Sequence, residues 1–217
     1  MEHHFWVGET ILGTRTPIVL PEIGFLDRLR DNDPVGDEEN EVIGRIDHVL
    51  VHPTQKPLNW CALESQAVYF SGKAIHHEFS MLSKASEHSF PFPAQHRRPD
   101  FRSSGPKRLL PQLQTKTPTI RTWGKKVAVV VDEPFFGSLT GLERERHLSN
   151  AEVVWFVVGY EPNETGWKLI PKDAVFTKLE SSVKALTGGT PLPKEKFEEQ
   201  LLAKLKISHP ESPLLFP

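Results

Sequence analysis

The sequence predicts a mixed α/β domain in which a central sheet is flanked by helices. Two unbroken apolar runs, at 127–131 and 153–158, are typical of central strands that are covered on both faces. Near the C-terminus, Phe197, Leu201 and Leu205 recur at helical spacing and predict a helix over about 193–206. The length of 217 residues suits one domain, residues 1–217. We expect a core over about 18–160 and a helical part over about 170–217.

The N-terminal half is expected to contain a short helix and two strands. Apolar residues at 23, 25, 26 and 29 fit one face of a helix over 21–29. An acidic stretch around Pro34 and Gly36, at 27–41, has the composition of an exposed loop. Two β-branched or apolar segments, 42–51 and 60–70, are separated by a proline-containing loop and are typical of adjacent strands.

Two further helices are expected. One begins after Ser71-Gly72 and carries apolar residues at helical spacing from Ile75. The other lies near 172–186, where Gly188-Gly189 stops it. These helices complete the α/β pattern.

Composition excludes several classes of protein. Lys and Arg number 26 against 28 Asp and Glu, so the net charge of −2 gives no overall attraction to nucleic acid or acidic membranes. No apolar run approaches the roughly 20 residues of a membrane span, and the N-terminus lacks the pattern of a secretory signal, so we expect a cytoplasmic protein. The single cysteine, Cys61, cannot supply a cysteine-rich zinc or iron site.

An acid within an apolar strand is the most informative feature. Side chains alternate along a strand, so Glu64 and Gln66 point to the same face. A buried carboxylate is costly unless it meets a cation or a metal. A hairpin joining the two strands would bring Asp47 beside Glu64. Two carboxylates and an amide oxygen are hard ligands, which suit Mg²⁺ rather than zinc.

The same residues occur in a wider pattern. An Asp precedes Glu-x-Gln by about fifteen to twenty residues, and the flanking segments are 60–72, 102–113 and 123–132. Together they resemble the NotI family of restriction endonucleases, a Glu-x-Gln variant of the PD-(D/E)XK nuclease superfamily. The resemblance covers roughly residues 20–160. It implies a PD-(D/E)XK restriction-endonuclease-like core and Mg²⁺-dependent hydrolysis of DNA phosphodiesters by a type II homodimer, with Mn²⁺ able to substitute.

The resemblance also implies roles for single residues. The metal-binding aspartate corresponds to Asp47 and the strand glutamate to Glu64. Gln66 replaces the usual lysine, and Glu22 is an accessory acid. NotI itself carries an additional N-terminal region in which four cysteines hold iron, a site that Cys61 alone cannot form.

Phosphodiester hydrolysis requires these residue types on independent grounds. A metal must acidify the attacking water and offset the charge that builds on the phosphoryl oxygens. Asp47 and Glu64 would hold the metal. Gln66 cannot act as a base or carry positive charge, so we assign it to orienting water or the metal shell through its amide.

A local excess of positive charge predicts the DNA-binding surface. Residues 97–126 contain nine cations and the single acid Asp100, which suits contact with phosphates. Ser103-Ser104-Gly105 before Pro106 suggests a helix start, where free N–H groups bind phosphate. The expected DNA-contacting residues are Arg97, Arg98, Arg102, Ser103, Ser104, Lys107, Arg108, Gln112, Lys116, Arg121 and Lys125.

Other interpretations remain open from the residues alone. Glu64 and Gln66 fit the solvent face of an edge strand, Asp47 fits an ion pair with Arg45, and the basic segment fits a solvated loop region. At the level of function, the alternatives are a catalytically inactive DNA-binding protein of the same fold, and a less sequence-specific nuclease in repair or phage defence.

Overall fold

The computed structural model describes residues 3–27, 42–68, 80, 100–163, 166–188 and 192–212, and for Asp27, Val42, Ile43 and Arg102 only the main chain. Its contacts divide the chain into a larger unit, Met1–Thr187, and a smaller one, Gly188–Pro217. Within the described residues, no helix is long and apolar enough to cross a membrane.

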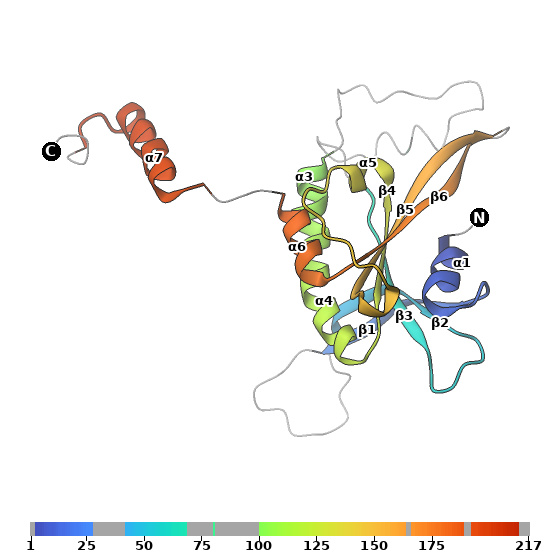
Figure 1. Cartoon of the computed structure of the whole chain (residues 1–217). Coiled ribbons are helices and arrows are strands. Elements are labelled where there is room, and N and C mark those ends of the chain that lie inside the picture. The colour runs from blue at the N-terminus through green and yellow to red at the C-terminus, as the bar shows by residue number, and fades with distance from the viewer. Residues whose placement is uncertain are drawn as a thin grey trace, which may run out of the picture. The chain divides into compact units, whose positions relative to one another are not determined.

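A six-stranded mixed sheet forms the larger unit, with the strands in sequence order (Figure 1). The first three strands are successively antiparallel, the third to fifth are parallel, and the last is antiparallel again. The strands are β1 (Ile18–Asp27), β2 (Val42–Val51), β3 (Trp60–Ser65), β4 (Val127–Asp132), β5 (Val153–Asn163) and β6 (Gly166–Thr177). The predicted mixed α/β class is therefore confirmed.

Helices cover both faces of this sheet (Figure 1). On one face lie α3 (Phe101–Ser104), the wider turn η2 (Gly105–Leu109) and α4 (Leu110–Thr122), which follow one another without a break, with α6 (Leu179–Thr187) beside α4. On the other face lie α1 (His3–Val7) and the turn η1 (Gly8–Leu12). The remaining described helices are α5 (Glu133–Gly137), the 3-10 turn η3 (Leu148–Asn150) and, in the smaller unit, α7 (Lys194–Ser208).

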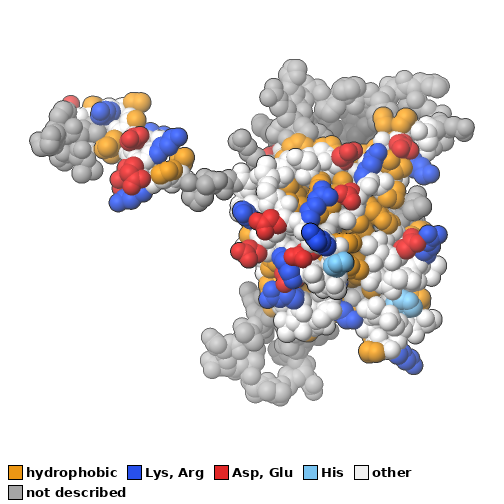
Figure 2. All heavy atoms as spheres, in the orientation of Figure 1, with side chains coloured by type: hydrophobic (Ala, Val, Ile, Leu, Met, Phe, Trp, Pro, Cys, Tyr) orange, Lys and Arg blue, Asp and Glu red, His pale blue; other side chains and the backbone are white. Residues whose placement is uncertain are grey.

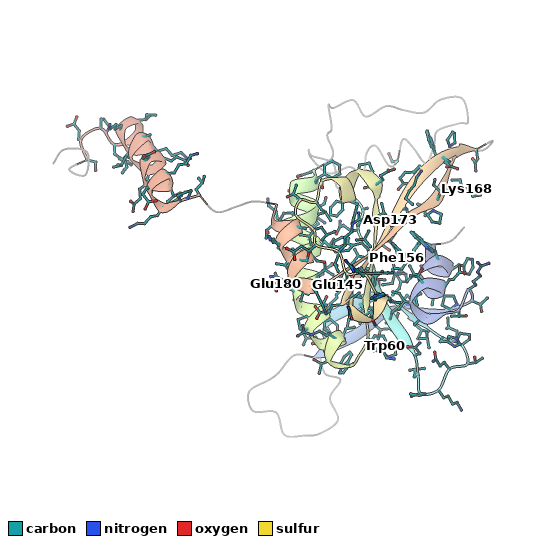
Figure 3. The ribbon with its side chains drawn as sticks, in the orientation of Figure 1. Trp60, Glu145, Phe156, Lys168, Asp173 and Glu180 are labelled. Atoms are coloured by element: carbon teal, nitrogen blue, oxygen red, sulfur yellow. The ribbon has the colours of Figure 1, made fainter. Side chains whose placement is uncertain are left out.

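Two apolar layers hold the sheet between these helices. On the α4 side, Val129 and Trp155 pack with Leu113 and Ile120. On the α1 side, Phe156, labelled in Figure 3, packs edge-on against Trp6 with ring centroids 4.9 Å apart. Side chains of β4 and β5 thus alternate between two buried layers, which explains why these strands are apolar without interruption.

Several elements agree with their prediction. Strand β2 has the predicted bounds, β4 and the first half of β5 coincide with the apolar runs, and α7 matches the predicted C-terminal helix to within two residues. Strand β3 covers only the first part of the predicted 60–70 segment. The acidic segment 28–41 and the helix expected after Gly72 lie outside the described residues, apart from Ser80.

One prediction of helix was wrong, and another gave a helix that is too long. The 21–29 segment belongs to strand β1, in which Glu22 has a φ of 51° and the register with β2 shifts between Gly24 and Asp27. These irregularities break the two-residue alternation, so the apolar spacing imitated a helix. The helix expected over 172–186 is confined to α6, because residues up to Thr177 pair with the long strand β5.

Candidate active site

Glu64 on β3 is buried in the layer between the sheet and α4, with its side chain 1% exposed. The antiparallel register pairs His48 with Leu63, and the next position along places Asp47 opposite Glu64. The Asp47 N–H lies 3.5 Å from Glu64 Oε1, and the Ser65 N–H lies 3.5 Å from Asp47 Oδ2. The hairpin therefore brings the two carboxylates together at the end of β3, as the sequence predicts.

A third charged group comes from helix α4. Lys116 Nζ lies 2.6 Å from Glu64 Oε1, and the lysine side chain is 7% exposed. Lys116 is on the buried face of α4, in line with Leu113 and Ile120. The ammonium therefore reaches the carboxylate through the apolar layer and not from the surface.

Burial controls the electrostatics of this pair. Desolvation raises the pKa of Glu64 to about 7, the ammonium of Lys116 opposes that rise, and the nearby charge of Asp47 adds to it. Glu64 Oε2 is buried and has no hydrogen-bond partner. One carboxylate oxygen is thus neutralised by Lys116 and the other is left for a further ligand.

The cost of such an arrangement points to a role beyond stability. Placing two ionised groups in an apolar layer is expensive, and a hydrophobic pair of similar volume often stabilises a protein equally well. Buried ionisable groups with a shifted pKa that lie side by side are typical of functional sites. Asp47, Glu64 and Lys116 are therefore the strongest candidate site in the described part of the chain.

Gln66 lies at the rim of this site. Its backbone N–H donates to the carbonyl of Val130 at 3.0 Å and extends the pairing of β3 with β4. Its amide Nε2 donates to the carbonyl of Ala67 at 2.5 Å. Gln66 also lines a cavity of about 500 Å³, which includes Asp132 and Tyr160 and lies at the carboxyl ends of the parallel strands. Gln66 makes no hydrogen bond with the carboxylates of Asp47 and Glu64.

Glu22 lies on the neighbouring strand β1 and not on a helix. The pairs Pro21–His48 and Ile23–Ile46 flank it, so it occupies the position across from Asp47. Its side chain is 74% exposed and accepts from Arg45 at 3.2 Å. The ion pair considered for Asp47 is thus made by Glu22 instead, and the edge-strand interpretation of Glu64 does not apply because β3 lies between β2 and β4.

The donor set suits Mg²⁺. Two adjacent carboxylates supply hard oxygen ligands, and the partnerless Oε2 of Glu64 is a buried acceptor for a cation. Among the described residues no group of three or more His, Cys, Asp or Glu forms a metal site. Mg²⁺ does not need one, since it commonly uses one or two carboxylates and keeps several waters. The residues therefore fit a magnesium ion.

Residues 4–169, more than half of the chain, match the family model described as restriction endonuclease NotI. The chain belongs to the NotI restriction endonuclease family. Members of the NotI family are DNA-cleaving hydrolases, and the matched segment contains Asp47, Glu64 and Lys116. Helices α6 and α7 lie beyond the match. The comparison with curated proteins gave no match.

The helix start in this NotI-family chain differs from the one predicted at Ser103-Ser104-Gly105 as a phosphate-binding site. The helix begins earlier than Ser103, at Phe101, and its N-cap is Asp100. The Asp100 carboxylate accepts from the Ser103 N–H at 2.9 Å, and the Ser104 side chain is buried. Because a carboxylate already occupies this helix start, phosphate binding there is disfavoured.

The other predicted DNA-contacting residues are dispersed along the helical segment. Lys107 and Arg108 are exposed in the first third of the segment, and Gln112 is exposed at its middle. At the end of α4, Arg121 pairs with Glu152 at 3.1 Å. Just beyond the helix, Lys125 Nζ donates to the Leu58 carbonyl and to Asn59 Oδ1, both at 3.2 Å. Arg97, Arg98 and the Arg102 side chain lie outside the described residues.

Positive and negative side chains are mixed on the surface of the protein. On the face drawn in Figure 2, described Lys and Arg side chains are interspersed with Asp and Glu side chains. Of the predicted DNA-contacting residues, Lys107 is thus well placed for phosphate contact, whereas Arg121 and Lys125 have partners within the protein.

Lys116 is the residue that the sequence analysis misplaced. It was expected to contact DNA, and the structure places its ammonium inside the protein against Glu64. A signal existed in the sequence. Lys116 stands three residues after Leu113 and four before Ile120, on the apolar stripe of a helix. A lysine on the apolar stripe of a helix and a glutamate in an apolar strand are expected to pair, because each buried charge needs an opposite charge.

Proposed function

We propose that this protein is a type II restriction endonuclease that hydrolyses phosphodiester bonds of double-stranded DNA with Mg²⁺, in a PD-(D/E)XK-like core. The observation that carries the proposal is the meeting of Asp47 and Glu64 on adjacent strands, within the segment that matches the NotI family. We further propose restriction of foreign DNA as its role and the cytoplasm, in association with the nucleoid, as its place of action.

Asp47 and Glu64 would hold the metal. When bound, Mg²⁺ supplies Lewis acidity toward water and the phosphoryl oxygens, and Mn²⁺ is expected to substitute. Glu64 would contribute from inside the protein, where burial fixes its position. Asp47 is partly exposed, so it would face the substrate side.

Gln66 and Glu22 have supporting roles in this proposal. The Gln66 amide has an oxygen and two N–H donors at the cavity rim, which suits orienting water. Its present bond to the Ala67 carbonyl would have to be exchanged for that role. Glu22, across from Asp47, would act as an accessory acid once released from Arg45.

We propose that two copies act together, because cleaving both strands of a palindromic site requires two active sites related by a two-fold axis. Helix α7 supports this proposal. Phe197, Leu201 and Leu205 recur every four residues and form an apolar stripe along the helix. An apolar stripe needs a partner surface, which a second copy would supply.

A cleavage assay tests the proposal. Purified protein is incubated with long unmethylated DNA and millimolar Mg²⁺, beside an EDTA control and a Glu64→Gln variant. Discrete fragments that require both Mg²⁺ and Glu64 are expected. A ladder in place of bands would favour a less specific nuclease.

The inactive DNA-binding alternative is favoured by one observation, that Lys116 already neutralises one oxygen of Glu64. In that case the pair would be purely structural. A salt-sensitive shift of DNA that persists in Glu64→Gln, without any cleavage, would support this alternative and contradict ours.

A further inference from the structure

We propose that Lys116 is a positioning residue of the active site, which delivers from helix α4 the positive charge that the neutral Gln66 cannot supply from the strand. This inference rests on the proposed nuclease function, because it assigns a role in that reaction.

The geometry of delivery is specific. Lys116 lies in the middle of α4, with Leu113 and Ile120 on either side along the same buried face. These neighbours are fully buried and pack against the sheet, so they fix the helix face from which the lysine extends. At 2.6 Å, its ammonium makes a charge-assisted hydrogen bond with Glu64 Oε1.

The hydrogen bond from Lys116 holds the Glu64 carboxylate in place and leaves one of its oxygens without a partner. Lys116 engages only Oε1, whereas Oε2 is buried and has no hydrogen-bond partner. On the other side, the Asp47 N–H lies 3.5 Å from the same Oε1. Glu64 is therefore held between helix and strand through Oε1, while Oε2 has no hydrogen-bond partner.

Gln66 explains why the charge must come from elsewhere. It directly follows β3, and its N–H still pairs with the Val130 carbonyl, so the alternation of side chains continues and directs a lysine at this position to the face of Glu64. An amide carries no charge and cannot offset a buried carboxylate. Without Lys116, Glu64 would have no opposite charge among its described contacts and would not stay in place beside Asp47.

Moving the lysine from position 116 to position 66 distinguishes a positioning role of Lys116 from a merely structural one. Lys116→Met removes the ammonium, and Gln66→Lys added to Lys116→Met returns a lysine within reach of Glu64 from the strand. A second variant, Lys116→Gln, removes the charge but keeps a hydrogen-bond donor for Glu64. It serves in place of Lys116→Met if the methionine variant does not fold. The matched control is Lys184→Met, which removes an exposed lysine of α6 whose ion pair with Glu143 spans 3.6 Å.

Steady-state cleavage of a DNA duplex in Mg²⁺ is the first readout. We expect Lys116→Met and Lys116→Gln to lower kcat at least 100-fold with KM for DNA within threefold of the parent, and Lys184→Met to match the parent. Adding Gln66→Lys to Lys116→Met should recover at least tenfold in kcat. A folded Lys116 variant with kcat within threefold of the parent would overturn the proposal, and so would a loss that relocation fails to recover.

Titration with Mn²⁺ alone, followed by calorimetry, is the second readout and does not depend on cleavage. We expect Lys116→Gln to bind Mn²⁺ at least tenfold more weakly than the parent, because Glu64 no longer stays beside Asp47. Equal binding would overturn the positioning role. If the parent itself cuts no DNA while Lys116→Gln still weakens Mn²⁺ binding, the proposed nuclease function fails, whereas the positioning of Glu64 by Lys116 for metal binding stands.

Discussion

The ammonium of Lys116 and the carboxylate of Glu64 form a 2.6 Å ion pair across the interface between helix α4 and the central sheet. Every other buried residue of the strand that carries Glu64 is apolar. Lys116 lies on the buried face of α4, where the other residues are Leu113, Ile120 and Thr117. The charged residue of the apolar strand and the charged residue of the buried helix face therefore contact each other. Asp47 adjoins the pair and makes it a three-charge cluster within the segment that matches the NotI family.

Removing one member of the pair should destabilise the protein. Lys116→Met leaves a buried carboxylate without its cation and is expected to lower the free energy of unfolding by about 3–5 kcal/mol. The double variant Lys116→Met with Glu64→Met replaces both charges by apolar groups and should recover most of that loss. Urea unfolding of the metal-free proteins measures both values. A double variant as unstable as the single one would show that the charge imbalance is not the cause.

Stability should depend on pH through Glu64. Because burial raises its pKa from 4.5 to about 7, the folded protein retains between these values a proton that the unfolded chain has released. The free energy of unfolding should therefore fall as the pH rises from 4.5 to 7, by up to about 3 kcal/mol. The Glu64→Gln variant should lose this part of the pH dependence, which unfolding curves at pH 5 and 8 would reveal.

Metal binding should change with pH in the opposite direction. A carboxylate ligand must lose its proton before it can bind a cation. The affinity for Mn²⁺ should therefore rise as the pH is raised toward about 7 and level off above it, with proton release on binding in the lower range. Calorimetry in buffers of different ionisation enthalpy counts the released protons. An affinity that is constant between pH 6 and 8 would contradict the assignment of Glu64 as a ligand.

Lys107, which is exposed near the start of the helical segment, should contribute more to DNA affinity than Arg121 at its end. Replacing Lys107 by Ala should weaken DNA binding and reduce the slope of log affinity against log salt by about 1, for one phosphate contact. Arg121→Ala should have the smaller effect, since Arg121 pairs with Glu152. Fluorescence anisotropy in Ca²⁺ tests this, and a reversed order would refute it.

Helix α7 should contribute to dimer formation. A charge placed on its apolar stripe, Leu201→Glu, is expected to shift the protein from dimer to monomer in light scattering. The control Ala203→Glu adds the same charge to a different side of the helix, about 200° around the axis, and should leave the dimer intact. Equal dimerisation of both variants would exclude the stripe as the contact surface.

The sequence predicted most of the sheet because its signals are local. Unbroken apolar runs identified β4 and β5, and a β-branched segment identified β2. The hairpin of β2 and β3 followed from one short loop, and with it the neighbourhood of Asp47 and Glu64. Strand β1 was mistaken for a helix, because the positive φ of Glu22 and the shifted register interrupt the alternation on which strand prediction depends.

The part of the site that escaped prediction depends on tertiary packing. Lys116 is 52 residues from Glu64 in the chain, and only the packing of α4 on the sheet brings them together. Counting charge along 97–126 grouped Lys116 with surface cations, whereas its position between Leu113 and Ile120 indicated burial. Net charge of a segment thus says little about which side chains face solvent.

Mg²⁺-dependent cleavage by the parent protein beside Glu64→Gln and Asp47→Asn tests the central claim most directly. Long unmethylated DNA is incubated with each protein in Mg²⁺ and in EDTA, after circular dichroism has shown that the variants are folded. The account predicts discrete fragments with the parent in Mg²⁺ alone, and a rate at least 100-fold lower with either variant. Cleavage that persists in both folded variants would contradict the assignment of Asp47 and Glu64 as the catalytic centre.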